Sequence, residues 1–173
     1  MSNTKRMILT ALFVALGVVL PMAFHSIPNA GSVFLPMHIP VFLCGLICGW
    51  AYGLGCGVLA PLLSSLMTGM PPAAILPGML CELAVYGLVS GLLLKVIHTK
   101  RTIVDLYLAL IGAMIAGRLV SGALNALIFR AGSYSLAAWT AASFVTALPG
   151  IAIQLVLIPI LVTALQRAGL VER

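Results

Sequence analysis

The chain has 173 residues, of which 62% are hydrophobic and 7% are charged, and its mean hydropathy is +1.22. These values lie far outside the range of soluble domains, so residues 1–173 are expected to form a single transmembrane domain in the lipid bilayer. The net charge of +6 comes from basic residues that flank hydrophobic segments, a pattern typical of membrane orientation and not of nucleic-acid binding.

Proline, glycine and charged residues divide the chain into apolar segments of about 20 residues, the length that crosses a bilayer. The sequence therefore predicts an all-α integral membrane protein with six transmembrane helices and no soluble catalytic domain. The second and third segments are short and are separated only by the turn at residues 49–53, so a re-entrant pair is an alternative. The six segments are residues 7–24, 33–49, 51–68, 73–97, 103–129 and 139–166.

Six spans would gather the main basic groups on one side of the membrane. Lys5, Arg6, the loop at residues 95–101, Arg167 and Arg173 would all share that face. The positive-inside rule assigns it to the cytoplasm, so both termini are expected to be cytoplasmic. The loops of the other face are candidates for a lid over a site; they are residues 25–32, 69–72 and 130–138.

Small residues recur every four positions in two regions, and at this spacing they let membrane helices pack closely. Ordinary helix packing is the main interpretation of both rows. Prolines within the apolar segments are expected to kink their helices, which suits a bundle with a cavity. The rows are Gly45, Gly49, Gly53 and Gly57, and Ala109, Ala113, Gly117 and Ser121; the prolines are Pro61, Pro77, Pro149 and Pro159.

Glu82 is the most informative residue, because no other formally charged residue occurs from position 7 to position 94. A charge at the centre of a membrane helix costs roughly 2.5 to 3.5 kcal/mol on insertion scales, so an intramembrane acid suggests a functional site. Arg118, in the middle of the next apolar segment, is its natural partner. At about 1.5 Å per residue, Glu82 would lie about 13 Å and Arg118 about 16 Å below the outer surface.

Two interpretations of this pair are open. Glu82 and Arg118 could form a buried ion pair that only holds helices together, or ligand groups could complete their hydrogen bonding, since Arg offers five donors. His38 and Asn125 fall in the outer half of the same bundle. His38 is either a capped interfacial residue or a ligand contact, and Trp139, like Tyr134, either anchors the sixth helix or covers a bound ring.

Other chemistry has little support in the sequence. The four cysteines lie in apolar stretches, and no His or acid joins Cys44 and Cys48 at ligand spacing, so neither a metal nor a cofactor is predicted. The motifs of zinc proteases, serine hydrolases and nucleotide-binding loops are missing, which indicates a protein that is not an enzyme.

Several motifs resemble those of the substrate-binding S components of energy-coupling factor (ECF) transporters. The resemblance spans nearly the whole chain and includes an A-x-x-x-A motif formed by Ala11 and Ala15. The other motifs are L-P-M-H-I-P-V-F-L-C-G at residues 35–45, L-S-S-L-M-T-G-M-P-P at 63–72, E-L-A-V-Y-G-L-V-S-G at 82–91 and A-G-R at 116–118.

The resemblance implies an S-component-like bundle in a prokaryotic cell membrane. It also implies that Ala11 and Ala15 dock a membrane coupling subunit, which works with two ATP-binding subunits, and that the protein binds a vitamin from outside. A pyridoxine- or niacin-like vitamin suits one acid and one guanidinium, with pantothenate possible. Glu82 would then accept from a ring N–H or hydroxyl, Arg118 would bind a carboxylate or phenolate, and Asn125 and His38 would lie nearer the entrance.

Two other classes of function stay open. A small membrane scaffold subunit would use the polar pair only for structure and would have no small-molecule ligand. An intramembrane enzyme would use Glu82 with His38 as acid and base, but it would need a second activated group at the same depth.

Overall fold

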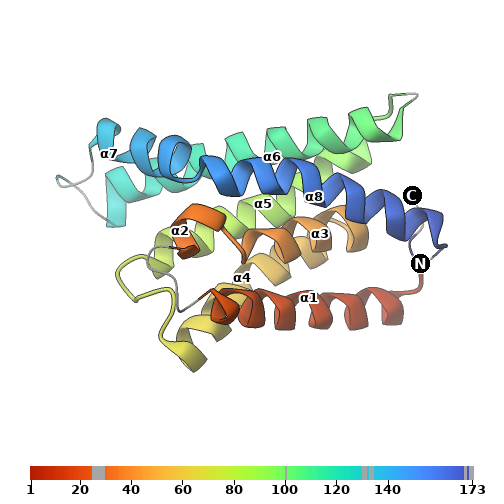
Figure 1. Cartoon of the computed structure of the whole chain (residues 1–173), viewed down its shortest axis with the longest axis horizontal. Helices are drawn as coiled ribbons and strands as arrows, with labels where there is room; N and C mark the ends of the chain where they lie inside the picture. Colours follow the sequence, from red (N-terminus) through yellow and green to blue (C-terminus); the bar gives the residue numbers. More distant parts are fainter. Residues whose placement is uncertain (25–29, 100, 130–131, 133–134, 170, 172–173) are drawn as a thin grey trace.

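The computed structural model is an all-helical bundle that confirms the predicted fold class (Figure 1). The structure describes residues 1–24, 30–99, 101–129, 132, 135–169 and 171. The long helices are α1 (Asn3–Ala23), α3 (His38–Cys48), α4 (Trp50–Thr68), α5 (Leu76–Val96), α6 (Thr102–Leu124) and α8 (Leu148–Arg167). The shorter elements are α2 (Ala30–Phe34), α7 (Leu136–Thr140) and the π-helical turns η1 (Asn125–Phe129) and η2 (Ala141–Thr146).

Six helical segments of the described chain are long and apolar enough to cross a membrane. The second, Gly31–Cys48, includes most of α2 and all of α3, and the third is Trp50–Thr68, so both of the short predicted segments reach spanning length. Both termini lie at one end of the bundle, here called the terminal end, together with the α3–α4 turn and the α5–α6 connection (Figure 1). The other end is called the distal end.

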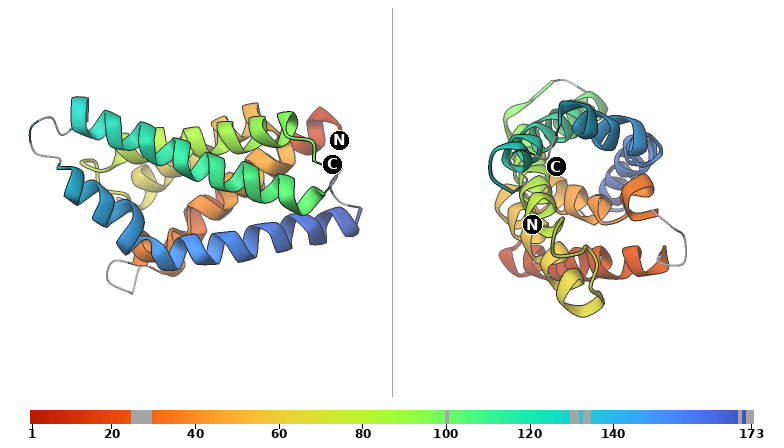
Figure 2. Two further views of the ribbon diagram at one scale, coloured as in Figure 1. Left: turned by 90° about the horizontal axis from the view of Figure 1, so that it is seen from above. Right: turned by 90° about the vertical axis from the view of Figure 1, so that its left-hand side faces the viewer.

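Helix α3 occupies the interior, and ten of its eleven residues are buried. It contacts α1, α4, α5 and α8, and a view along the bundle places it between α1 and α6 (Figure 2). The segment that precedes it is broken at Leu35, which has a positive φ of 51° and is followed by Pro36. A residue before proline is disfavoured in the helical region, so α2 ends there and α3 begins afresh at His38.

The glycine row packs helices together, although it does not lie on one helix. Gly45 belongs to α3, Gly49 forms the turn with a φ of 99°, and Gly53 and Gly57 belong to α4. A Cβ atom at Gly53 would lie 2.3 Å from the Gly87 carbonyl oxygen of α5, which is closer than real contacts allow. The second row, on α6, is buried, and it faces α5 where Gly117 meets the ring of Tyr86; its members are Ala109, Ala113, Gly117 and Ser121.

Two predictions, one about kinks and one about a helix boundary, were wrong, and the position of proline explains both. Pro77 and Pro149 were expected to kink helices, but each lies in the first two residues of its helix, where the missing N–H needs no partner. The predicted sixth helix, residues 139–166, is divided at Ala147 into η2 and α8. Pro149 cannot donate to the carbonyl of Val145, so a continuous helix would leave that group unpaired.

The close contact between α4 and α5 makes a direct stability prediction. A Cβ at Gly57 would lie 2.3 Å from the Leu83 carbonyl oxygen, whereas one at Gly55 would meet nothing within 4 Å. We expect Gly57→Ala to lower the free energy of unfolding by about 1–3 kcal/mol through overpacking. Gly55→Ala should be neutral or stabilising by up to about 1 kcal/mol. The measurement is thermal unfolding of both variants in detergent. Equal changes in unfolding temperature would contradict this packing.

Candidate functional site

The structure brings Glu82 of α5 and Arg118 of α6 together inside the bundle. The Nε atom of Arg118 lies 4.0 Å from Oε1 of Glu82, and their side chains are 5% and 24% exposed, respectively. The two helices approach closely because Gly117 has no side chain to hold them apart. Two opposite charges separated in the sequence therefore meet at one level of the bundle, as expected from their depths.

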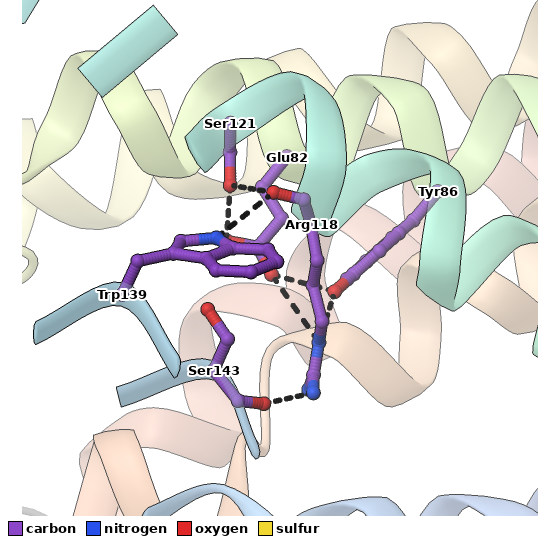
Figure 3. Close-up of polar contacts among 6 residues, drawn as sticks. All are labelled: Glu82, Tyr86, Arg118, Ser121, Trp139 and Ser143. Carbon is purple, nitrogen blue, oxygen red and sulfur yellow. Dashed lines mark hydrogen bonds and ion pairs between the residues drawn. The ribbon is translucent and has the colours of Figure 1, made fainter. Parts of the chain in front are cut away.

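The hydroxyl group of Tyr86 links the two charges. It donates to Oε1 of Glu82 at 2.5 Å and accepts from Nε of Arg118 at 3.0 Å (Figure 3). The Tyr86 side chain is fully buried and stacks on Phe42, with ring centroids 4.8 Å apart, while the His38 ring lies 5.4 Å away. This packing fixes the hydroxyl, so carboxylate, phenol and guanidinium form one hydrogen-bonded series.

A second hydroxyl and an amide extend the polar cluster toward the distal end. Ser121 donates to Oε2 of Glu82 at 3.3 Å, with the Arg118 carbonyl oxygen 3.4 Å away as an alternative acceptor. Asn125, one turn further along, donates to the Ser121 carbonyl oxygen at 2.8 Å and packs on Gly78. Asn125 therefore lies beside the cluster, bound to helix backbone.

The segment Leu136–Thr146, which we call the lid segment, closes over Arg118. Nη1 of Arg118 donates to the Ser143 carbonyl oxygen, and Nε1 of Trp139 donates to the Arg118 carbonyl oxygen at 3.2 Å (Figure 3). The guanidinium carbon also lies 5.4 Å from the centre of the Phe144 ring, within the range of a cation–π contact. Trp139, on α7, thus covers the polar cluster. Tyr134 lies outside the described residues.

Three buried side-chain atoms of the described structure have no hydrogen-bond partner; Nε of Arg6 belongs to α1, and the other two belong to α3 and α8. One is Nδ1 of His38, whose residue is 3% exposed, and the other is Nε2 of Gln154 on α8, whose residue is 1% exposed. His38 is therefore an interior residue against Tyr86 and not the capped interfacial residue considered above. Unpaired buried donors and acceptors carry a desolvation cost of about 1–3 kcal/mol, which marks them as candidates for ligand contacts.

Sequence reasoning missed several members of the cluster. Tyr86 follows Glu82 by four residues and Ser121 follows Arg118 by three, so both share a helical face with a predicted residue. That spacing was the available signal. Ser143 contributes only its backbone carbonyl, which no side-chain pattern could have indicated.

The predicted partner-binding residues Ala11 and Ala15 lie elsewhere, on α1. Both are exposed, whereas Phe13 and Gly17 face the bundle. Only 17% of the apolar stretch of α1 is buried, the smallest share among the six spanning segments of the described chain. The side of α1 that carries the two alanines is therefore free to meet lipid or another protein.

Metal-binding geometry is not found among the described residues, where no three or more His, Cys, Asp or Glu side chains could hold an ion. Cys44, Cys48 and Cys56 are buried with free thiols. The Cys44 thiol donates to the Thr10 hydroxyl at 3.6 Å, and the three side chains otherwise pack in the hydrophobic core as small hydrophobic residues.

Comparison with protein families finds one match that covers most of the chain. Residues 5–162 match the family described as ECF transporter, substrate-specific component. Comparisons with curated proteins and with solved structures give no significant match.

The series through Tyr86 predicts that its hydroxyl contributes to stability. Tyr86→Phe keeps the ring stacked but removes the acceptor of Arg118 and the donor to Glu82, so we expect a loss of about 1–3 kcal/mol in the free energy of unfolding. The matched control is Tyr107→Phe on α6, where the side chain is 36% exposed. Equal effects of the two changes on thermal unfolding in detergent would rule out the bridging role.

Proposed function

Because the chain belongs to the family of ECF transporter substrate-specific components, we propose that it captures a vitamin or related small molecule outside the cell and passes it to an ATP-driven coupling module. Members of this family are membrane substrate-binding subunits, and ATP hydrolysis would take place in partner subunits. The observation that supports the proposed site is the hydrogen-bonded series of Glu82, Tyr86 and Arg118. Its charges cost energy in an apolar bundle, and a ligand would use them.

The chemistry of the site favours a small aromatic ligand with a donor and an acidic group. Arg118 uses two of its five N–H groups within the protein, which leaves three for a carboxylate or phenolate. Glu82 is 24% exposed and would accept from a ring N–H or a hydroxyl. Phe144 and Trp139 offer aromatic surface beside the charges. A pyridoxine- or niacin-like vitamin meets these demands, and pantothenate is possible.

Further contacts would come from residues next to the series. The unpaired Nδ1 of His38, whose ring lies 5.4 Å from that of Tyr86, would find a partner on the ligand. Asn125 would act nearer the entrance. Nanomolar affinity corresponds to about 12 kcal/mol, which a buried ring with a few charge-assisted hydrogen bonds can supply.

The lid segment would control access to this site. Its contacts with the site are made through the Arg118 side chain and backbone, so movement of the segment would uncover the guanidinium. The break at Ala147 separates the segment from α8 and would let it move without disturbing that span. We therefore place ligand entry at the distal end.

This arrangement would also set the orientation of the protein in a prokaryotic cell membrane. The distal end would face outward, and the terminal end, with Lys5, Arg6, Lys95, Arg101 and Arg167, would face the cytoplasm as the positive-inside rule requires. Both termini would then be cytoplasmic. The exposed face of α1 around Ala11 and Ala15 would dock the coupling subunit, which acts with two ATP-binding subunits.

The first test is mass spectrometry of small molecules released by denaturing the purified protein. A tight binder retains its cargo during detergent extraction, so we expect one vitamin in a stoichiometric amount. A protein that is empty and shows no thermal shift with a panel of vitamins would contradict substrate capture and favour a scaffold role.

The site itself is tested by Glu82→Ala combined with Arg118→Ala. Each residue is expected to make a charge-assisted hydrogen bond worth about 1.5–3 kcal/mol, so affinity for the identified vitamin should fall by a hundredfold or more. Calorimetry on folded protein measures it, with Lys95→Gln at the terminal end as the control for a lost charge. Unchanged affinity in the folded double variant would place the ligand elsewhere.

The docking face is tested by Ala15→Trp, which adds a large ring to the exposed side of α1. We expect loss of co-purification with the coupling subunit and loss of uptake, while vitamin binding by the isolated protein is kept. The matched control is Ala152→Trp on α8, which is also exposed. Transport that survived Ala15→Trp would reject this face as the docking surface.

A further inference from the structure

A cavity at the terminal end lies far from the polar cluster and takes no part in the proposed transport site. It has a volume of about 670 Å³ and is formed where α6 begins and α8 ends. The two helices contact each other, and both reach this end of the bundle (Figure 1). Ligand pockets commonly measure about 300–1,000 Å³, so the cavity is large enough for a small polar group.

The cavity is positively charged. Arg101, just before α6, and Arg167, the last residue of α8, both line it, and no acidic residue of the described chain does. Within the described part of the chain, neither guanidinium makes a hydrogen bond or an ion pair. The nearest acid in sequence, Asp105, is buried and accepts hydrogen bonds from the backbone and hydroxyl of Thr99, at 2.8 Å and 2.5 Å.

The start of α6 adds a further preference for an anion. Arg101 occupies the N-cap position and has no acceptor atom, so no side chain caps the first N–H groups of the helix. Helix N-termini carry partial positive charge and favour phosphate groups. Together with two guanidinium groups, this end of α6 suits a phosphate oxygen better than any neutral group.

The walls of the cavity identify the source of that phosphate. Ile103 and Val104 line it and are 56% and 39% exposed, on a helix that lies among the spanning segments. Gln166 supplies an amide beside the arginines. The cavity therefore combines two cations at the end of a span, the level of lipid headgroups, with exposed apolar side chains in the first turn of α6.

From this arrangement we propose that the cavity between α6 and α8 binds an anionic glycerophospholipid. Arg101 and Arg167 hold the phosphate, Gln166 hydrogen-bonds the headgroup, and an acyl chain runs along Ile103 and Val104. A free phosphate ion could bind the two arginines, but it has no apolar part that would contact Ile103 and Val104. The proposal does not depend on the identity of the transported substrate.

The experiment is native mass spectrometry of the protein in neutral detergent with equal amounts of phosphatidylglycerol and phosphatidylcholine of the same acyl chains. The wild type should retain one phosphatidylglycerol preferentially. Loss of charge-assisted hydrogen bonds predicts a drop in this preference of about tenfold in Arg101→Gln combined with Arg167→Gln. The control, Lys5→Gln combined with Lys95→Gln, removes two exposed cations at the same end outside the cavity and should keep the preference.

The outcomes separate the alternatives. Equal loss in both double variants would overturn the proposal, because it would show general attraction to a basic end. Thermal stabilisation by inorganic phosphate as large as that by phosphatidylglycerol would also overturn it, in favour of a free anion. Thr163→Phe, which narrows the cavity while leaving both arginines in place, provides a second test and should reduce lipid retention. Full retention in that variant would place the lipid elsewhere.

Discussion

The hydrogen-bonded series from Glu82 through Tyr86 to Arg118 is the interaction on which the arrangement of α5 and α6 depends. A carboxylate and a guanidinium inside an apolar bundle are tolerated only if each is paired and hydrogen-bonded, and breaking such a pair costs about 3–5 kcal/mol. Tyr86 meets this demand by acting as donor to one charge and acceptor of the other. These polar contacts therefore hold α5 and α6 at one depth relative to each other.

Small residues make that series possible, because polar groups can meet only where the backbones approach. Gly117 admits the Tyr86 ring, and Gly122 admits the indole of Trp139, whose Nε1 would lie 2.3 Å from a Cβ at that position. On the other side of α5, Gly53 and Gly87 bring α4 into direct backbone contact. Close backbone packing at glycines therefore holds α5 against α4, and hydrogen bonds between charged and polar groups hold it against α6.

The sequence was most informative where a residue carries a large free-energy cost in a membrane helix. A lone acid in a long apolar run is expensive, so Glu82 and then Arg118 could be found and their depths compared. Tyr86 and Ser121 cost little in a membrane helix, and their importance arises only from which face of the helix they share with the charges. The six spans followed from length and hydropathy, but the division at Ala147 did not, since Pro149 suits either a kink or a helix start.

The geometry of Arg118 bears on how a closed lid and a bound ligand could coexist. Its contacts with Tyr86 and the Ser143 carbonyl use two of its five N–H groups, so an acidic ligand group could bind the others without displacing the lid segment. Closure would then cover the ligand with Trp139 and Phe144 and exclude water, which strengthens each electrostatic contact inside. Under the proposed function, the same guanidinium would recognise the ligand and hold the lid, so tight binding and closure would favour each other.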